Sequence, residues 1–403
     1  MKNNATISAI AEQIRGVSYK PVDVFERPSN GLVPLLRAGN IGDGRLLLDD
    51  LVYVSEKRVS EKQHLQNDDI LICASSGSIK VVGKAVRVSV FRGTFGAFCK
   101  VLRPNTALVD ASYFAHFFQC PRYRATISSR AAGANINNIR NEDLDSLEIP
   151  VPKISTQRAI AVRLDKVCDL IDKRQAQLSR LDELAKSLFV EMFGDPVDNP
   201  MRWETKPILS LGECRNGLNF APNESGFSIP CIGVSDFKDR AIITREIPLQ
   251  EVSLAGKPAE SQLLRDGDFL FVRSNGNKAL VGRCVLVLRD GGMTTFSGFC
   301  IRFRLHSHMP IAPRYLLHVF RSDSIRRKLA GRGANIQNMS QKTLEPLSIP
   351  VPPLSLQRTF VERIEAIDKS KFAILRWLSY FDREAATKSA RRGLSPAPWR
   401  DCN

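Results

Sequence analysis

The feature that most constrains the fold of this chain is a long internal repeat. The segment GANINNIRNEDLDSLEIPVPKISTQR, which begins at Gly133, returns without a change of register as GANIQNMSQKTLEPLSIPVPPLSLQR from Gly333. Solenoid repeats have periods of about 20–50 residues, so a period of this length does not describe a stack of small units. The chain is therefore expected to contain two copies of one domain, each followed by the same connecting segment.

Looser similarity extends the repeat towards the start of each copy. DDILICASSGS from Asp68 matches GDFLFVRSNGN from Gly267, and FGAFC from Phe95 matches FSGFC from Phe296. Each copy contains short runs of apolar and β-branched residues, at 70–74 and 81–90 in the first and at 269–273 and 279–288 in the second. Gly, Ser and Asn separate these runs, which is typical of strands joined by tight turns. We therefore predict two tandem mixed α/β domains of the α+β kind, each of about 150 residues.

Each domain is expected to end at a proline-rich connector, at 149–152 and 349–353, because proline restricts its own backbone and that of the preceding residue. A helix should follow each connector, with Ser155 and Ser355 as N-caps. In both helices, residues on one face are spaced alternately three and four positions apart, which is typical of a coiled-coil seam. The apolar seam residues are Leu164, Val167, Ile171, Leu178, Leu181, Ala185, Leu188 and Met192 in the first helix, and Ile364, Ile367, Ile374, Leu378, Phe381 and Ala385 in the second.

We expect the two helices to pack as an antiparallel coiled coil with pseudo-twofold symmetry, although amphipathic helices are often ordinary core elements. Arg174 and Lys371 are the single cations in the seams and are expected to lie in different layers, because two facing cations would repel. The predicted boundaries are 1–152 for the first domain, 153–196 for the first helical spacer, 197–352 for the second domain and 353–390 for the second spacer. A disordered tail is expected over 391–403.

The charge of the chain indicates a polyanionic partner. It has 58 Lys and Arg against 42 Asp and Glu, a formal charge of +16, and no run of apolar residues long enough to span a membrane. Residues 1–152 hold 19 basic and 15 acidic side chains, and residues 200–352 hold 21 and 13, so the two domains carry +4 and +8. The nine cysteines include no C-x-x-C pair, which argues against a disulfide framework and a zinc cluster. We expect reduced thiols and a cytoplasmic location.

The usual catalytic motifs are absent. The nearest approach to a phosphate-binding loop runs from Gly77 to Lys84, but its spacing is wrong and Ala85 replaces the required Ser or Thr. The Asn/Asp-Pro-Pro-Tyr/Phe motif of amino-group methyltransferases does not occur. His306 and His308 have no Cys or carboxylate cluster near them in the sequence. We therefore expect no catalytic residue, no metal site and no cofactor in this chain.

Polar and cationic loops in equivalent places of the two domains are the best candidates for contact with DNA. Arg can bind guanine through two hydrogen bonds, Asn can bind adenine, and hydroxyl groups and Lys can hold phosphates. Solvated hairpin tips and structural turns are the alternative interpretation of these segments. The candidates are Ser75, Ser76, Ser78, Lys80, Lys84, Arg87, Arg130 and Asn135 in the first copy, and Arg273, Ser274, Asn275, Asn277, Lys278, Arg283, Arg332 and Asn335 in the second.

Taken together, these segments resemble the DNA-specificity subunit of type I restriction-modification systems. In that family two variable target-recognition domains are each followed by a conserved helical spacer. The resemblance covers residues 1–390 and rests on the paired GAN-x-x-N, Ile-Pro-Val-Pro and Gln-Arg segments and on MFGDP from Met192. The family commonly has Glu before the repeated Gln, whereas this chain has Thr156 and Leu356 there.

The resemblance implies a non-catalytic adapter that binds a bipartite, asymmetric site in double-stranded DNA, with residues 1–152 and 197–352 as its target-recognition domains. It also implies two methyltransferase subunits that modify adenine, together with restriction and motor subunits. S-adenosylmethionine, ATP and Mg are then expected on these partners. Two alternatives are a specificity chain that serves a fused methyltransferase-nuclease and a stand-alone DNA-binding regulator.

Overall fold

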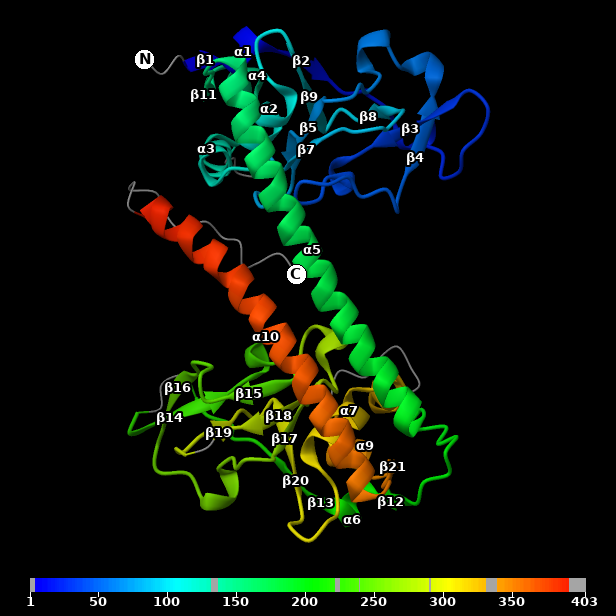
Figure 1. The fold of residues 1–403 in the computed structure, drawn as a ribbon, viewed down its shortest axis with the longest axis vertical. Coiled ribbons are helices and arrows are strands. Elements are labelled where there is room, and N and C mark those ends of the chain that lie inside the picture. Colours follow the sequence, from blue (N-terminus) through cyan, green and yellow to red (C-terminus); the bar gives the residue numbers. More distant parts are fainter. Residues whose placement is uncertain are drawn as a thin grey trace. The chain divides into compact units, whose positions relative to one another are not determined.

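The computed structural model describes residues 4–131, 137–221, 225–238, 240–289, 291–330 and 339–390 (Figure 1). Contacts divide the protein into two compact units, Met1–Gln175 with Leu378–Asn403, and Ala176–Trp377. Each unit takes in one globular domain and part of each long helix, α5 (Ile154–Phe193) and α10 (Leu354–Ala390). The boundaries predicted from the sequence separate domain from helix and stay a prediction. The tail expected to be disordered, 391–403, lies outside the described residues.

The domain of the first unit is built on two sheets. The larger sheet has the strand order β2-β9-β5-β7 and is antiparallel throughout: β2 (Ala11–Arg15), β9 (Cys99–Pro104), β5 (Ile70–Cys73) and β7 (Ala85–Arg87). The smaller sheet has the order β4-β3-β8, with β4 (Val52–Ser55), β3 (Leu32–Leu36) and β8 (Thr94–Phe95), and β8 runs parallel to β3. The α-helices in the described part of this domain are α1 (Ile7–Ile10), α2 (Ala111–Phe117), α3 (Pro121–Ala131) and α4 (Asn141–Asp145).

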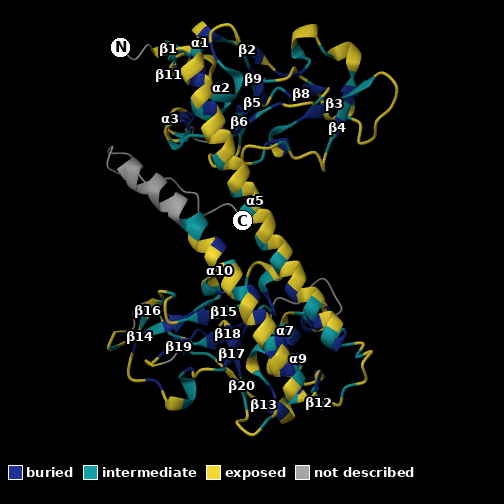
Figure 2. Cartoon of the chain, in the orientation of Figure 1, coloured by how far each residue is buried: buried dark blue, intermediate teal, exposed yellow. Residues whose placement is uncertain are grey.

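Strand β5 is buried on both faces, which explains why its sequence, ILIC, is apolar throughout. Ile70 and Ile72 belong to a cluster with Phe114 and Tyr123 of helices α2 and α3. Leu71 and Cys73 alternate with them and belong to a second cluster that reaches the smaller sheet. The strand therefore lies between a layer of helices and a layer of sheet, and it is dark blue in Figure 2.

The second unit repeats this architecture with one added strand. Its larger sheet has the order β13-β20-β17-β18-β15, from β13 (Gly212–Asn216), β20 (Cys300–Leu305), β17 (Phe269–Val272), β18 (Cys284–Leu288) and β15 (Ile242–Thr244), and β15 joins β18 in parallel. Its smaller sheet is β16 (Gln250–Leu254), β14 (Phe227–Ile232) and β19 (Thr295–Phe296). The helices are α6 (Ile208–Leu211), α7 (Pro313–Arg321), α8 (Asp323–Ala330) and α9 (Gln341–Leu344).

Two of the predicted strands begin later than expected. The runs 81–90 and 279–288 were expected to be extended from their first residues, but β7 and β18 begin at Ala85 and Cys284. Gly83 and Gly282 adopt positive φ angles of 79° and 77°, so the chain turns at these positions before each strand begins. The residues before the glycines are apolar because they fill the turn: Val82 is fully buried and Val281 is 6% exposed.

Each repeat contains the same buried ion pair between neighbouring strands. Arg103 donates to both carboxylate oxygens of Asp69 at 2.8 Å, and Arg304 does the same to Asp268 at 2.7 Å. The two carboxylates are 0% and 1% exposed. In each guanidinium, one of the nitrogens that bind the carboxylate also donates to a backbone carbonyl, that of His64 or Leu263. A charge buried this deeply is tolerated because it is paired and its remaining hydrogen-bonding capacity is used.

A repeated glutamine fastens each long helix to its own domain. Gln157 accepts a hydrogen bond from the backbone N–H of Asp110 and donates to the carbonyls of Pro152 and Leu108. Gln357 makes the equivalent bonds to Ala312, Pro352 and Pro310. Both glutamines are at most 1% exposed. The amide therefore bridges the connector, the helix and the domain.

The predicted helix caps are wrong. The helices begin at Ile154 and Leu354, so Ser155 and Ser355 lie within the first turn. The backbone N–H of Gln157 bonds to the carbonyl of Lys153, the residue just before the first helix. The connectors before the helices are also short strands: β11 (Glu148–Pro150) pairs with β1 (Asn4–Thr6), and β21 (Ser348–Pro350) pairs with β12 (Thr205–Pro207). Because each connector is anchored in a strand pair, the helix can begin directly after it.

Within the second unit, α5 and α10 pack in opposite directions, as predicted. Phe189 and Phe193 contact Phe360 at ring-centroid distances of 5.6 and 5.3 Å, and Asp182 forms an ion pair with Lys371. Residue numbers rise along one helix as they fall along the other, which defines an antiparallel pair. Arg174 belongs to the other unit, so the expectation that Arg174 and Lys371 lie in different layers stays a prediction.

Burial along the helices follows the predicted seam in most places. Ala185, Ile364, Ile367 and Ile374 are buried, and Leu181, Leu188 and Met192 pack against the core of the second unit. Leu178, Leu378, Val167 and Ile171 are half-buried. Leu164 is 39% exposed, and the nearby Ala161 is buried instead. Phe381 and Ala385 lie outside the residues whose side chains are described. No described helix combines the length and apolar character that a membrane span requires.

Candidate nucleic-acid interface

The serine loop of the first domain lies next to the start of the segment that leads to α4. Ser75 and Ser76 form β6, which pairs antiparallel with β10 (Asn137–Asn138). The N–H of Ile139 also donates to the carbonyl of Ala74 at 2.8 Å. In the second domain the corresponding bond runs from Met339 to the carbonyl of Arg273 at 2.7 Å. The fold thus brings together two segments that the sequence singled out separately. Asn135, Arg332 and Asn335 lie outside the described residues.

Arginines of the helical layer hold the far end of each loop. Arg124 on α3 donates to the carbonyls of Val82 and Lys80 at 2.6 and 2.9 Å. Arg326 on α8, at the equivalent position, donates to the carbonyl of Ala279 at 3.2 Å. The loops are therefore fixed to the helices behind them at the turn that precedes β7 and β18.

Most of the predicted DNA-contact cations are already engaged inside the protein. Lys84 pairs with Asp43 at 2.9 Å, and Arg87 pairs with Asp68 at 2.6 Å. In the second domain Arg283 donates to the carbonyl of Lys238 at 2.6 Å. These contacts give the side chains a structural role. The ion pairs are part-exposed, and such pairs contribute little stability, so Lys84 and Arg87 can exchange their carboxylate for a phosphate at low cost.

Arg130 has a structural role as well. It donates to the carbonyl of Asp143 at 2.7 Å and to the hydroxyl of Ser146 at 3.0 Å, which ties α3 to α4. This contact gives the Arg130 side chain a role in joining the two helices. Lys80 differs from these cations, because its side chain is exposed and the described residues supply no partner for it. It is the cation of the first loop that is most available to a ligand.

The polar residues of the second loop shape the loop itself. Asn275 accepts a hydrogen bond from the N–H of Asn277 at 2.8 Å, and Asn277 accepts one from the N–H of Ala279 at 3.0 Å. In the first loop, Ser76 accepts from the N–H of Ser78 at 3.2 Å. Arg273 reaches the carbonyl of Gly298 at 3.4 Å, and Ser274 lies beside it in the described backbone. The side chain of Lys278 is outside the described residues.

Sequence reasoning missed one pair of residues beside these loops. Phe98 and Phe299 are 64% and 61% exposed, although Phe95, Cys99, Phe296 and Cys300 of the two FGAFC and FSGFC motifs are buried. The carbonyl of Phe98 accepts hydrogen bonds from the N–H groups of Ala74 and Ser75. The signal was present in the repeat, which places a phenylalanine at the same point of both copies, but the sequence alone predicts only an apolar strand residue there.

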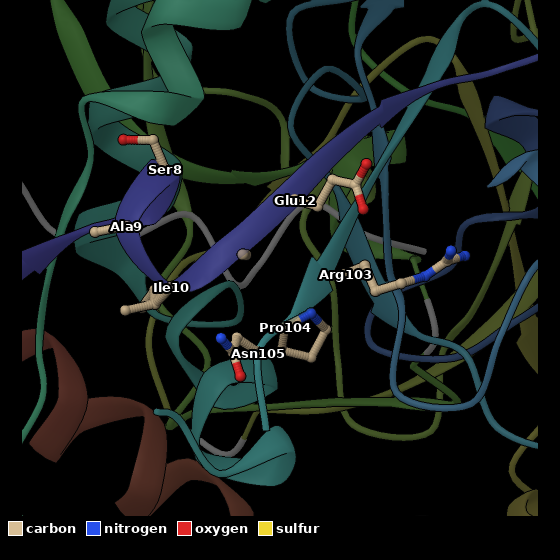
Figure 3. A pocket seen from close by; sticks show the side chains of 8 residues that line it. Ser8, Ala9, Ile10, Glu12, Arg103, Pro104 and Asn105 are labelled. Atoms are coloured by element: carbon tan, nitrogen blue, oxygen red, sulfur yellow. The ribbon is translucent and has the colours of Figure 1, made fainter. Parts of the chain in front are cut away.

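The described surface also has a shallow depression of about 540 Å³, lined by residues 8–12 and 103–105 (Figure 3). Glu12 and Arg103 are its charged residues. A hydrogen bond from Lys62, 2.6 Å away, lowers the pKa of Glu12, and the hydrogen bonds to Asp69 raise the pKa of Arg103. Both groups are held in ion pairs, so neither is suited to act as a general acid or base at neutral pH.

The thiols and histidines provide no further chemical site among the described residues. Burial raises the pKa of Cys73 and Cys214 to about 11 and that of Cys231 to about 12, so these thiols stay protonated at neutral pH and are poor nucleophiles. The rings of His306 and His308 stack with centroids 5.7 Å apart. No group of three or more metal-binding side chains occurs in the described part of the chain.

Comparison with known proteins agrees with these features. Residues 17–181 match the family model described as the type I restriction modification DNA specificity domain. The chain is 33% identical over 385 residues to the type I restriction enzyme EcoKI specificity subunit of Escherichia coli (strain K12), which covers 90% of this chain and 81% of that protein. It is 32% identical over 381 residues to the StySPI specificity subunit of Salmonella potsdam, with the same coverage of both chains.

The fold is also similar to that of a solved structure. The type I restriction-modification S subunit from M. genitalium has a TM-score of 0.55 and 14% identity, and the match covers 96% of this chain and 94% of that one. The matches to the two curated relatives each cover 90% of this chain. On these grounds the chain belongs to the family of type I restriction enzyme specificity subunits.

Proposed function

We propose that this specificity subunit recognises a bipartite, asymmetric DNA site, with each domain binding one half-site. The observation that carries the proposal is the contrast between framework and loop. The ion pairs of Asp69 and Asp268 and the glutamine contacts recur in both domains. The loops mounted on this framework differ, with SSGS in the first domain and SNGN in the second. Two unlike loops on one scaffold suit the recognition of two unlike sequences.

In this proposal the chain itself is non-catalytic. Two methyltransferase subunits, which hold S-adenosylmethionine, methylate adenine at the site that this chain selects, and restriction and motor subunits, which hold ATP and Mg, cleave the DNA. A second solved structure of similar fold, with a TM-score of 0.54 and 15% identity, concerns complex assembly and conformational transition of the type I R-M system. The long helices α5 and α10 set the separation of the half-sites, because helix length converts directly into distance at about 1.5 Å per residue.

Affinity is expected to come largely from contacts with the phosphate backbone. The domains carry charges of +4 and +8, from 19 basic against 15 acidic and 21 against 13 side chains. Neutralising phosphates releases counterions, so binding should weaken steeply as the salt concentration rises. The second domain is expected to contribute the larger share of this salt dependence.

Mapping methylated adenines tests the proposal directly. The chain is co-expressed with its candidate methyltransferase in a host that lacks the system, and N6-methyladenine is mapped across the genome. The expected result is a single split motif. Replacing residues 1–152 with the corresponding domain of a relative should change one half of that motif and leave the other half and the spacing unchanged. Absence of any motif in a complex shown to assemble, or a change in both halves, would contradict the proposal.

A further inference from the structure

An exposed phenylalanine occupies the same place in both domains. Phe98 is 64% exposed and Phe299 is 61% exposed, in turns whose neighbours Phe95, Cys99, Phe296 and Cys300 are fully buried. Single exposed apolar residues are common on protein surfaces and by themselves indicate nothing. Two copies of a domain that have diverged in most positions, yet both present a phenylalanine outward from the same turn, indicate a requirement that both domains share.

Both rings are carried on a rigid backbone. The carbonyl of Phe98 accepts hydrogen bonds from Ala74 at 2.8 Å and from Ser75 at 3.1 Å. The carbonyl of Phe299 accepts the corresponding bonds from Arg273 at 2.7 Å and Ser274 at 3.4 Å. Each turn is thus tied to the first residues of the candidate DNA-contact loop. A ring held in this way loses little conformational freedom when it meets a ligand.

The charge around the rings favours a polyanion as that ligand. The two loops and the two turns, 74–84, 94–98, 273–283 and 295–299, contain no Asp or Glu in their sequences, and the loops include Lys80, Lys84, Arg273, Lys278 and Arg283. One carboxylate, that of Asp43, approaches from another loop and pairs with Lys84. An apolar ring on a turn that is bonded to a basic loop fits nucleic acid, which offers apolar base faces between lines of phosphates.

We propose that Phe98 and Phe299 insert against the bases of the bound duplex, one in each half-site, as apolar wedges at a base step. This inference rests on the proposed function. Because the residue is the same in both domains while the neighbouring loops differ, the wedge does not select the sequence. It holds each half-site in a locally unstacked form that the variable residues beside it can reach. Phenylalanine is one of the side chains that proteins use to part a base step in this way.

The test uses the full chain in complex with its methyltransferase and a duplex that carries the motif mapped as described above. 2-Aminopurine, whose fluorescence rises when its stacking is disturbed, replaces an adenine other than the methylated one in one half-site at a time. In F98A the fluorescence rise should be lost in the half-site of the first domain only, and affinity should fall about tenfold. In F299A the fluorescence rise should be lost in the half-site of the second domain only. F98L should keep most of the fluorescence rise and most of the affinity.

Val22→Ala and Leu209→Ala are the matched controls, because these apolar residues are 80% and 41% exposed and lie away from the loops and turns in the sequence of each domain. They should leave fluorescence and affinity unchanged, and all variants should melt within a few degrees of the parent.

If the parent complex binds its motif and F98A and F299A behave like the controls, the wedge is disproved and the proposed function stands. If the variants instead no longer bind the methyltransferase subunit but keep the fluorescence rise, the rings contact that subunit and not DNA, which also overturns the inference. A parent complex that binds no motif contradicts the proposed function itself.

Discussion

The two domains are alike in the contacts that hold the chain together and unlike where each meets its long helix. In the first unit the junction is polar: Ser112 and His116 of α2 bind Asp165 of α5, at 3.0 and 2.7 Å. In the second unit the residues at the same place in α7 are Arg314 and His318. Arg314 pairs with Asp368 at 2.9 Å, and His318 is half-buried.

The difference arises from what packs on each junction. In the second unit His318 stacks on Phe189 of α5 and contacts Phe360 of α10, with ring centroids 6.1 and 5.0 Å apart. The aromatic end of α5 therefore closes this junction and makes it part of the core. The buried polar contacts are the same in both copies, because replacing one partner leaves the other buried without a hydrogen bond. The apolar packing around them differs between the copies, because apolar contacts do not depend on one specific partner.

Removing the shared ion pair should have the largest effect and should be equal in the two domains. Asp69→Ala leaves Arg103 unpaired, and Asp268→Ala leaves Arg304 unpaired, so each variant should lose about 3–5 kcal/mol of unfolding free energy. Denaturant titration of the full chain measures this loss. The control is Asp50→Ala, whose carboxylate is 86% exposed in its pair with Arg37 and should contribute less than about 1 kcal/mol. A large loss in one domain only would show that the framework is not shared.

Acid should weaken the second unit through His318. Burial, with Arg321, Lys371 and Arg314 acting in the same direction, lowers the pKa of His318 to about 4, against about 6.5 in the unfolded chain. The folded state then binds fewer protons between pH 6.5 and 4, so its stability is full above pH 6.5 and falls by up to about 3 kcal/mol as the pH drops to 4. Melting curves across this range should show a smaller pH dependence for His318→Phe than for the parent. If the melting temperature fell equally with pH in the variant and the parent, groups other than His318 would cause the acid sensitivity.

The two turn glycines should differ in their tolerance of a side chain. Both have positive φ, which costs an alanine about 1–2 kcal/mol. A Cβ at Gly83 would also lie 2.5 Å from Ile127, whereas at Gly282 its nearest neighbour is Leu329 at 3.4 Å, an ordinary contact. Gly83→Ala is therefore expected to destabilise the chain by roughly 1–2 kcal/mol more than Gly282→Ala. Thermal melts of the two variants measure the difference, and equal losses would mean that α3 moves aside.

The smallest expected effects are those of replacing an exposed cation and a hydrogen-bonded cation of the first domain. Lys80 is exposed, so Lys80→Ala should lower the salt dependence of DNA binding by about one phosphate contact and leave folding unchanged. Arg130 binds Asp143 and Ser146, so Arg130→Ala should instead lower stability by about 1–2 kcal/mol with little change in salt dependence. Binding measured at several salt concentrations, with a melting curve for each variant, distinguishes the two. A reversal of the two results would disprove the assignment.

Much of the architecture was predictable because the sequence contains an internal repeat. The match of residues 133–158 with 333–358 predicted the two domains, and the alternating spacing along both helices predicted an apolar seam. The antiparallel direction was predicted from the pseudo-twofold relation of the two copies, and the contact of Phe189 with Phe360, which were not predicted seam residues, confirms it within the second unit. The helix starts were not predictable from local signals. Ser155 looks like a cap, but the helix begins two residues earlier than that cap would place it, after the strand pair and with Gln157 bonded to Pro152 and Asp110.

The sequence by itself determined the duplication, the helical spacers, the excess of positive charge and the family, because each of these is a pattern along the chain. Only the tertiary structure decided which side chains remain available to DNA. Lys84, Arg130 and Arg283 find partners that lie 13–45 residues away, and such pairings have no periodic signature. Phe98 and Phe299 face outward because folding places each turn against a loop more than twenty residues away, a contact that no local pattern along the chain specifies.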